Sequence, residues 1–308
     1  MKNKSFNSFL FLLTVIIIII YVGCSKSNDT PATTTTTTSS ITVKLANSST
    51  LGSYLVDKNG VALYFFSDDF KGKNSCAGGC ALYWPYFYAG KLTQDSLGTG
   101  LKLSDFDTIH VGTSIQTRYK NWPLYYYSPT GDGKPEASGI TSGEAAQGVW
   151  FVAKPDYSIM LAKGQLTGLD GKNYTSTYTV GDGTTTYFTD AKGLTLYTFS
   201  VDSFNKNKFT NAAFSNNASW PIYDTTAMVV PSILNKALFN TITVFGHSQI
   251  TYNGWPLYYF GQDGKIMGNT KGVSVPVAGK WPVAVKSISQ APEKAGSVSG
   301  SGSGSGSY

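Results

Sequence analysis

Short apolar runs separated by turn-forming residues dominate the chain between residues 41 and 290. Residues 54–56 and 61–66 are rich in β-forming side chains and are joined by residues 57–60, Asp-Lys-Asn-Gly. The Asn-Gly pair supplies the positive φ angles that a tight hairpin turn requires. Because side chains alternate between the two faces of a strand, the unbroken apolar run 61–66 predicts a strand that is covered on both sides.

This strand pattern occurs twice along the chain. Residues 57–66 (DKNGVALYFF) match 190–199 (DAKGLTLYTF), and residues 122–127 match 255–260 at the same spacing. Repetition at a fixed spacing indicates a tandem duplication. We therefore predict an all-β fold of two tandem homologous β-domains, which is sandwich-, barrel- or propeller-like. The six tryptophans form three repeat-related pairs: Trp84 and Trp220, Trp122 and Trp255, Trp150 and Trp281.

Each predicted domain also contains a weaker duplication, so we expect two strand modules in each. Leu-Tyr-x-aromatic occurs four times, and three copies carry an Asp five residues after the Tyr. In the remaining copy an apparent insertion at residues 129–130 displaces the acid to Asp132. An Asp beyond a strand can bond backbone N–H groups of the next turn, so we favour a framework role over a proton-relay or cation site. The motif residues are Tyr64 and Asp69, Tyr125 and Asp132, Tyr197 and Asp202, and Tyr258 and Asp263.

The segments outside the repeats differ in composition. Lys2 and Lys4 precede an apolar run over residues 9–22, which is typical of a secretory signal peptide and short for a membrane span of about 20 residues. The Thr/Ser-rich stretch that follows cannot bury a core and predicts a flexible tether. The predicted organisation is a signal peptide at 1–23, a tether at 24–40, a first β repeat domain at 41–165, a linker at 166–173, a second β repeat domain at 174–290 and a Gly/Ser-rich tail at 291–308.

The three cysteines suggest one lipid anchor and one pair. Residues 21–24 (Tyr-Val-Gly-Cys) resemble a bacterial lipobox, although a Leu is usual where Tyr21 stands, so we expect lipidation of Cys24. An ordinary secreted protein and an uncleaved anchor helix are the alternatives. Cys76 and Cys80 then remain, and the glycines between them let a small loop close in an oxidising compartment. We expect a local disulfide, with a redox or metal-binding pair as the alternative.

Charge and composition exclude several classes of function. Charged residues make up 14% of the 308 residues, well below the roughly 25% of an average domain. Removal of the signal peptide lowers the net charge from +6 to +4, and Arg118 is the only arginine, so no nucleic-acid partner is expected. His110 and His247 have no counterparts in the other repeat, and there is no Gly-x-Ser-x-Gly motif. We therefore expect no catalytic residues, metal ion or cofactor.

Several motifs together resemble the secreted repeat of bacterial lipoproteins. They are the Tyr-x4-Asp signature after a hairpin, Cys76-x3-Cys80 leading into Trp84-Pro85, and residues 116–119 (QTRY) before 122–125 (WPLY). The resemblance covers most of the chain outside the signal, tether and tail, and it implies no established activity. In the second repeat Ala212 and Asn216 stand about where the cysteines would be, so the disulfide cannot be essential to both copies.

We expect a lipid-anchored cell-envelope protein, at the outer membrane or cell surface, that acts as a non-enzymatic binding or surface-structure module. Its expected partners are the membrane, through the lipid, and an extracellular glycan or envelope protein. Trp122 and Trp255 form the candidate ligand platform, although Trp-Pro pairs can instead fill the core. The alternative is a redox accessory or enzyme using Cys76 and Cys80 or the Tyr-Asp motif. Exposed tryptophans in a row would favour ligand binding, whereas complete burial would favour a structural surface subunit.

Overall fold

Strands, turns and short 3-10 helices make up the fold, and the predicted all-β class is confirmed. A computed structural model describes residues 40–293; the predicted signal peptide, Cys24 and the tail from residue 294 lie outside the described residues. No helix in this described part is long and apolar enough to cross a membrane. The strands are β1 (Val43–Ser48), β2 (Gly52–Asp57), β3 (Tyr64–Phe66), β4 (Phe106–Val111), β5 (Ser114–Tyr119), β6 (Trp122–Pro123), β7 (Trp150–Val152), β8 (Met160–Thr167), β9 (Asn173–Tyr174), β10 (Thr184–Thr189), β11 (Phe239–Val244), β12 (His247–Tyr252) and β13 (Trp255–Pro256). The helices are α1 (Cys80–Tyr83) and the 3-10 helices η1 (Ser67–Asp69), η2 (Gln94–Ser96), η3 (Leu103–Asp105), η4 (Ala146–Gly148), η5 (Lys236–Leu238), η6 (Gly261–Asp263) and η7 (Lys271–Ser274).

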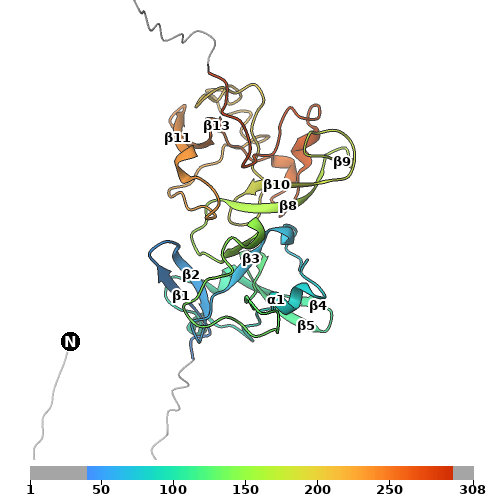
Figure 1. Cartoon of the computed structure of the whole chain (residues 1–308). Coiled ribbons are helices and arrows are strands. Elements are labelled where there is room, and N and C mark those ends of the chain that lie inside the picture. The colour runs from blue at the N-terminus through green and yellow to red at the C-terminus, as the bar shows by residue number, and fades with distance from the viewer. Residues whose placement is uncertain (1–39, 294–308) are drawn as a thin grey trace, which may run out of the picture. The chain divides into compact units, whose positions relative to one another are not determined.

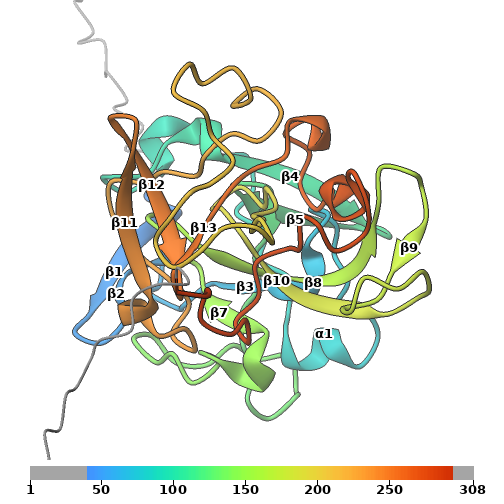
Figure 2. The same cartoon turned by 90° about the horizontal axis from the view of Figure 1, so that it is seen from above.

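The strands pair in five small antiparallel sheets, and none of the sheets within residues 40–293 closes on itself. Their strand orders are β1-β2, β3-β7, β4-β5-β6, β10-β8-β9 and β11-β12-β13. Strands of the first repeat lie together in the lower half of Figure 1, and those of the second lie in the upper half. Figure 2 shows the β11–β12 hairpin (orange) apart from the β8–β10 pair (yellow-green).

The strand order of two sheets is the same in both halves of the chain, as the predicted duplication requires. The β4-β5-β6 sheet of the first half has its counterpart in β11-β12-β13, and β2 with its partner β1 corresponds to β10 with its partner β8. The second structural repeat therefore begins with β8, earlier than the predicted boundary at residue 174. Residues 166–173, predicted as a linker, are the end of β8 and the turn into β9. The limits of independent domains stay a prediction.

The turn at residues 57–60 forms because the Asp57 side chain supports it. Asp57 Oδ1 accepts backbone N–H bonds from Asn59 at 2.8 Å and from Val61 at 2.9 Å. Gly60 has φ +86°, a conformation that glycine adopts without strain. Asp190 makes the same two bonds in the second repeat, at 2.8 and 2.9 Å. Both repeats thus use one Asx-type turn to set the hairpin.

The β3 strand is buried on both sides, as its unbroken apolar sequence predicts. Leu63 and Phe65 pack into a hydrophobic cluster that contains residues of both repeats, including Trp281. Tyr64 and Phe66 face a separate cluster within the first repeat. Because the first cluster draws on both halves, the described residues belong to one compact unit.

The predicted disulfide is confirmed. Cys76 and Cys80 are bonded with their Cα atoms 5.3 Å apart, and α1 begins at the second of them. In the second repeat an asparagine holds the equivalent loop. Asn216 donates through Nδ2 to the Phe209 carbonyl and accepts at Oδ1 from the Asn211 N–H at 3.3 Å. Hydrogen bonds of the Asn216 side-chain amide therefore take the place of the disulfide bond.

Replacement of both cysteines, Cys76→Ser with Cys80→Ser, is expected to lower the free energy of unfolding by about 2 kcal/mol, because the disulfide closes only a very small loop. Urea denaturation followed by circular dichroism measures this loss, and wild-type protein unfolded in reductant should show a similar one. A protein that no longer folds, or one that loses a defined activity while staying folded, would contradict the structural role.

Candidate functional site

The motif tyrosines and acids of the second repeat form crossed pairs. Tyr258 Oη donates to Asp202 Oδ2 at 2.8 Å, and Tyr197 Oη donates to Asp263 Oδ2 at 2.7 Å, so each tyrosine binds the acid of the other module. The two tyrosines also exchange backbone N–H···O bonds at 2.8 and 2.9 Å. The other oxygen of each carboxylate accepts a backbone N–H of the following turn at 2.8 Å. These bonds join the two modules to each other.

The first repeat keeps this crossed arrangement but not the predicted fourth acid. Tyr125 Oη donates to Asp69 Oδ2 at 2.6 Å, whereas Tyr64 Oη donates to Glu136. Asp132, predicted in that role, is exposed and accepts the backbone N–H of the second residue after it. The prediction of Asp132 is wrong because the insertion moves the loop outward, and the longer Glu136 side chain reaches the buried tyrosine. Glu136 and Asp263 are each followed by a Thr-x-Gly sequence, at residues 141–143 and 270–272. This shared sequence is the signal that aligns the two acids.

Burial sets the electrostatics of the pairs. Desolvation raises the pKa of Asp69, Asp202 and Asp263 to about 7 each, although hydrogen bonds from a tyrosine and a backbone N–H oppose the shift. It also raises the pKa of Tyr197 and Tyr258. The three carboxylates are at most 6% exposed. Because both oxygens of each are bonded internally, the pairs are suited to joining strands rather than to binding a substrate.

The tryptophan platform predicted at Trp122 and Trp255 is wrong. Trp122 is fully buried, and Trp255 is partly buried with its Nε1 donating to the Ser289 carbonyl at 2.8 Å. The other tryptophans are at most 5% exposed, and Trp220 stacks on Trp281 with ring centroids 3.7 Å apart. Small sheets need large apolar side chains to form a core, so the tryptophans fill the interior instead of facing a ligand.

A pocket of about 770 Å³ opens on the second repeat. This volume lies in the range typical of small-molecule sites. Its walls come from the Asp190 turn, the segment before β11, the residues that follow β13, and two residues that precede β8. Tyr259 Oη donates to Asp190 Oδ2 at 3.0 Å, and burial raises the pKa of this carboxyl. The lining residues are Tyr157, Ser158, Asp190, Ala191, Lys192, Leu194, Thr195, Ala218, Pro221, Tyr223, Asp224, Thr225, Tyr259, Phe260, Gly261, Asp263, Lys265 and Ile266.

A smaller residue lines this pocket than stands at the equivalent position of the first repeat. The two residues before the paired tryptophans are Leu82 and Tyr83 in the first repeat, and Ala218 and Ser219 in the second. The loop that contains the insertion at residues 129–130 packs on Tyr83, where a Cβ on Gly131 would meet the tyrosine ring at 2.5 Å. The second repeat has neither the large side chains nor this insertion. The pocket could not be predicted from the sequence because its lining comes from several distant segments and carries no motif.

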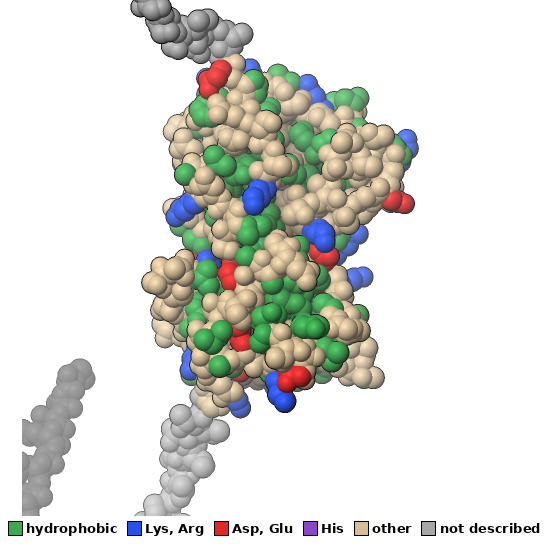
Figure 3. Space-filling model, viewed as in Figure 1, with side chains coloured by type: hydrophobic (Ala, Val, Ile, Leu, Met, Phe, Trp, Pro, Cys, Tyr) green, Lys and Arg blue, Asp and Glu red, His purple; other side chains and the backbone are tan. Residues whose placement is uncertain are grey.

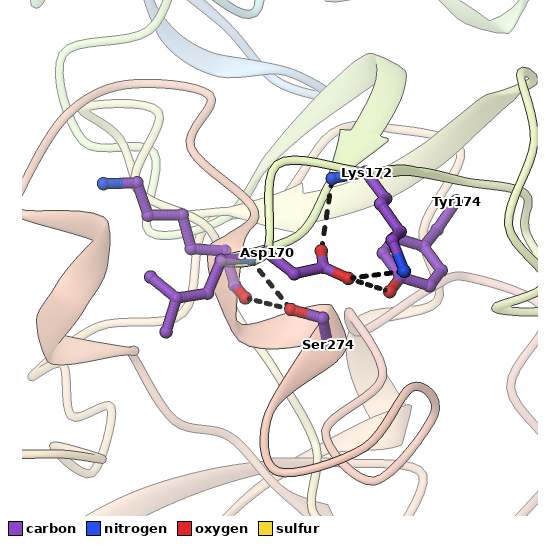
Figure 4. A network of polar contacts seen from close by, with 6 residues as sticks. Asp170, Lys172, Tyr174 and Ser274 are labelled. Atoms are coloured by element: carbon purple, nitrogen blue, oxygen red, sulfur yellow. Dashed lines mark hydrogen bonds and ion pairs between the residues drawn. The ribbon is translucent and has the colours of Figure 1, made fainter.

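A second polar cluster anchors the loop between β8 and β9 (Figure 4). Asp170 Oδ2 accepts from Tyr174 Oη at 2.8 Å, and its Oδ1 accepts from the Lys172 N–H at 3.2 Å. The Leu169 N–H donates to Ser274 Oγ at 2.9 Å, which ties the loop to η7. These contacts hold the loop in shape and fix it to one distant segment of the chain, η7.

Comparison with known proteins finds a family match for one part of the chain. Residues 242–285 match the family described as a secreted repeat of unknown function. The matched segment contains β12 and β13, the motif pair Tyr258 and Asp263, and Trp281. No curated protein and no solved structure shows significant similarity to the chain. The resemblance to a secreted repeat is therefore confirmed over residues 242–285, which match a family whose function is unknown.

Proposed function

We propose that the protein is a lipid-anchored envelope protein that binds an extracellular glycan in the pocket of the second repeat without chemical turnover. The pocket itself carries this proposal. The match to a secreted repeat supports a location outside the cytoplasm, and the lipobox-like sequence that ends at Cys24 supports the anchor. The lining of the pocket includes no His or Cys, which are common catalytic groups, and this supports binding without turnover.

The pocket lining suits a sugar ring. Tyr259, Leu194 and Pro221 are partly exposed and offer apolar surface on which the C–H face of a sugar can pack. Exposed polar side chains also belong to the lining, among them Lys192, Asp224 and Lys265. A mostly apolar wall with a few oriented polar groups is the usual composition of a ligand site. The face of the molecule in Figure 3 likewise shows scattered charges among hydrophobic side chains.

Filling the pocket should abolish binding without unfolding the protein. Ala218→Leu introduces the side chain that the first repeat carries at the equivalent position, and Ala218 is exposed, so the fold should tolerate it. We expect at least about a tenfold loss of affinity in calorimetric titrations with a panel of soluble neutral and acidic oligosaccharides.

Ala218→Ser, which keeps the pocket open, is the matched control and should bind like the wild type. Unchanged affinity in the Ala218→Leu variant would contradict the location of the site. A panel in which no oligosaccharide binds the wild type would contradict glycan binding itself.

A structural surface subunit is the second candidate, because five of the six tryptophans are at most 5% exposed and form no binding row. Gentle detergent extraction of the native protein followed by light scattering distinguishes between these two candidate functions. Stable homo-oligomers or assemblies with other envelope proteins would favour the structural role, and a monomer that binds glycan would favour the first proposal.

A further inference from the structure

Three aromatic side chains form an exposed cluster on the second repeat, outside the pocket lining. Phe245 lies in the turn between β11 and β12 and is 58% exposed. Its ring centroid is 6.4 Å from that of the half-buried Phe214, and the Phe214 centroid is 4.3 Å from that of the exposed His247. Among the residues that the structure describes, none of the three belongs to a hydrophobic cluster of the core. We call Phe214, Phe245 and His247 the aromatic patch.

Phe245 holds a backbone conformation that suits other residues better. Phe245 and Gly246 have φ angles of +47° and +88°, the signs of a type I′ turn, in which Asn-Gly, Asp-Gly and Gly-Gly are the preferred pairs. The next turn of the same sheet has such a pair, Asn253 and Gly254, at +49° and +82°. A bulky side chain at positive φ is rare and lowers stability, and such strain is concentrated at functional sites.

The first repeat has glycine at both phenylalanine positions. Gly112 begins the β4–β5 turn, as Phe245 begins the β11–β12 turn, and its φ is +60°. Gly78 is the central residue of the disulfide loop, as Phe214 is of residues 212–216, and their φ angles are +59° and +52°. Glycine is the unstrained choice at both positions. Two separate loops of the second repeat carry rings there instead, and the rings meet in space, which points to a role other than stability.

The two segments that carry the aromatic patch are uncharged. Residues 209–223 and 239–256 contain no Asp, Glu, Lys or Arg. An anionic membrane surface or an acidic sugar would be attracted by basic side chains. Exposed aromatic rings beside neutral hydrogen-bonding groups suit the C–H face and the hydroxyls of a neutral sugar. The exposed hydroxyl and amide side chains of these segments include Asn211, Ser215, Thr243 and Ser248.

The aromatic patch and the pocket share one turn of the chain. The Asn217 N–H donates to the Phe214 carbonyl at 3.1 Å, and Ala218 of the pocket lining follows directly. Such a turn holds the Cα atoms of its first and fourth residues within about 7 Å, so the Cα atoms of Phe214 and Ala218 are at most roughly 11 Å apart. An oligosaccharide held in the pocket is therefore long enough to reach the patch.

We infer that the aromatic patch is a second subsite, which binds one neutral sugar ring of the glycan held in the pocket. This inference rests on the proposed function and specifies the ligand as an oligosaccharide with an uncharged ring outside the pocket. Phe245, the most exposed of the three rings, packs on the C–H face of that sugar ring. Phe214 meets Phe245 at an interplanar angle of 82° and supports it from the side.

The test removes the exposed ring and relieves the strained turn in one step. Phe245→Asn gives the turn the Asn-Gly sequence that residues 253–254 already have. The variant should melt at the same temperature as the wild type or higher. In calorimetric titrations with neutral gluco-, manno- and xylo-oligosaccharides, its affinity for a bound hexasaccharide should fall about tenfold. Its affinity for the matching monosaccharide, which occupies the pocket alone, should not change.

Tyr88→Asn is the matched control, because Tyr88 is an aromatic residue of the first repeat and is 49% exposed. It should bind every sugar like the wild type. A Phe245→Asn variant that binds the hexasaccharide like the wild type would overturn the inference. A melting temperature several degrees lower would also overturn it, because the ring would then be a structural contact between two loops.

Two further results separate this inference from its alternatives. If no glycan of any kind binds the wild type, the proposed function and the inference both fail. If Ala218→Leu abolishes binding whereas chain length and Phe245→Asn have no effect, the pocket stands and the second subsite does not. Co-sedimentation with phosphatidylglycerol vesicles that is lost in Phe245→Asn would overturn the inference in favour of a membrane contact.

Discussion

Trp281→Ala is expected to lower the free energy of unfolding by about 3–5 kcal/mol, the usual cost of removing a buried aromatic side chain. Trp281 is 2% exposed and stacks on Trp220 at 3.7 Å and on Phe199 at 4.3 Å between ring centroids. It also meets Tyr258 edge to face at 5.2 Å. Truncation therefore leaves a cavity lined by these three aromatic neighbours and by Phe209. Urea denaturation followed by circular dichroism measures the change.

Trp255→Ala is the matched control, because the Trp255 side chain is only partly buried and its indole N–H makes one hydrogen bond, to the Ser289 carbonyl. We expect a loss of about 1–2 kcal/mol. Trp150, which stacks on Trp84 at 3.7 Å in the first repeat, should behave like Trp281. Equal losses of unfolding free energy in the Trp281→Ala and Trp255→Ala variants would show that the stacked Trp220–Trp281 pair is not the centre of the core.

Local sequence patterns predicted those parts of the fold that neighbouring residues determine. The Asp57 turn, the strand at 61–66 buried on both faces, and the duplication can all be recognised from short-range order. The Cys76–Cys80 disulfide also follows from a short spacing. By contrast, the membership of β8 in the second repeat depends on pairing with β10, across the β9 hairpin, and no local pattern indicates it.

The candidate site was less predictable because it depends on contacts between distant residues. Tyr64 and Glu136 are 72 positions apart, and the insertion after Tyr125 breaks the five-residue spacing that the other three motif tyrosines keep to their acids. The burial of Trp122 could not be predicted from its position in the sequence, because the packing of the whole unit determines which side chains are exposed. The pocket, in turn, is lined by residues from several distant segments, including the small Ala218, and such a lining carries no chemical signature in the sequence.

The buried Asp69, Asp202 and Asp263 should make the protein less stable as the pH rises from 5 to 8. Burial raises the pKa of each carboxyl to about 7 in the folded state, from 3.8 for an ordinary Asp. Between these two pKa values the folded state binds more protons than the unfolded chain, so stability is greatest at low pH and falls until the pH passes 7. Each carboxyl contributes a slope of at most about 1.4 kcal/mol per pH unit. Thermal unfolding at a series of pH values measures the fall.

Asp202→Asn isolates one of the three contributions. The amide has the size of the protonated acid and cannot ionise, so the fall in stability between pH 5 and pH 8 should shrink by roughly one third, its share among three similar groups. Asp132→Asn is the control, because Asp132 is exposed and its pKa is lowered to about 2, chiefly by the backbone N–H bond from Lys134. That acid stays ionised throughout this pH range, and its replacement should leave the pH dependence unchanged. A wild-type protein whose stability rises from pH 5 to pH 8 would show instead that the crossed pairs hold their carboxylates ionised.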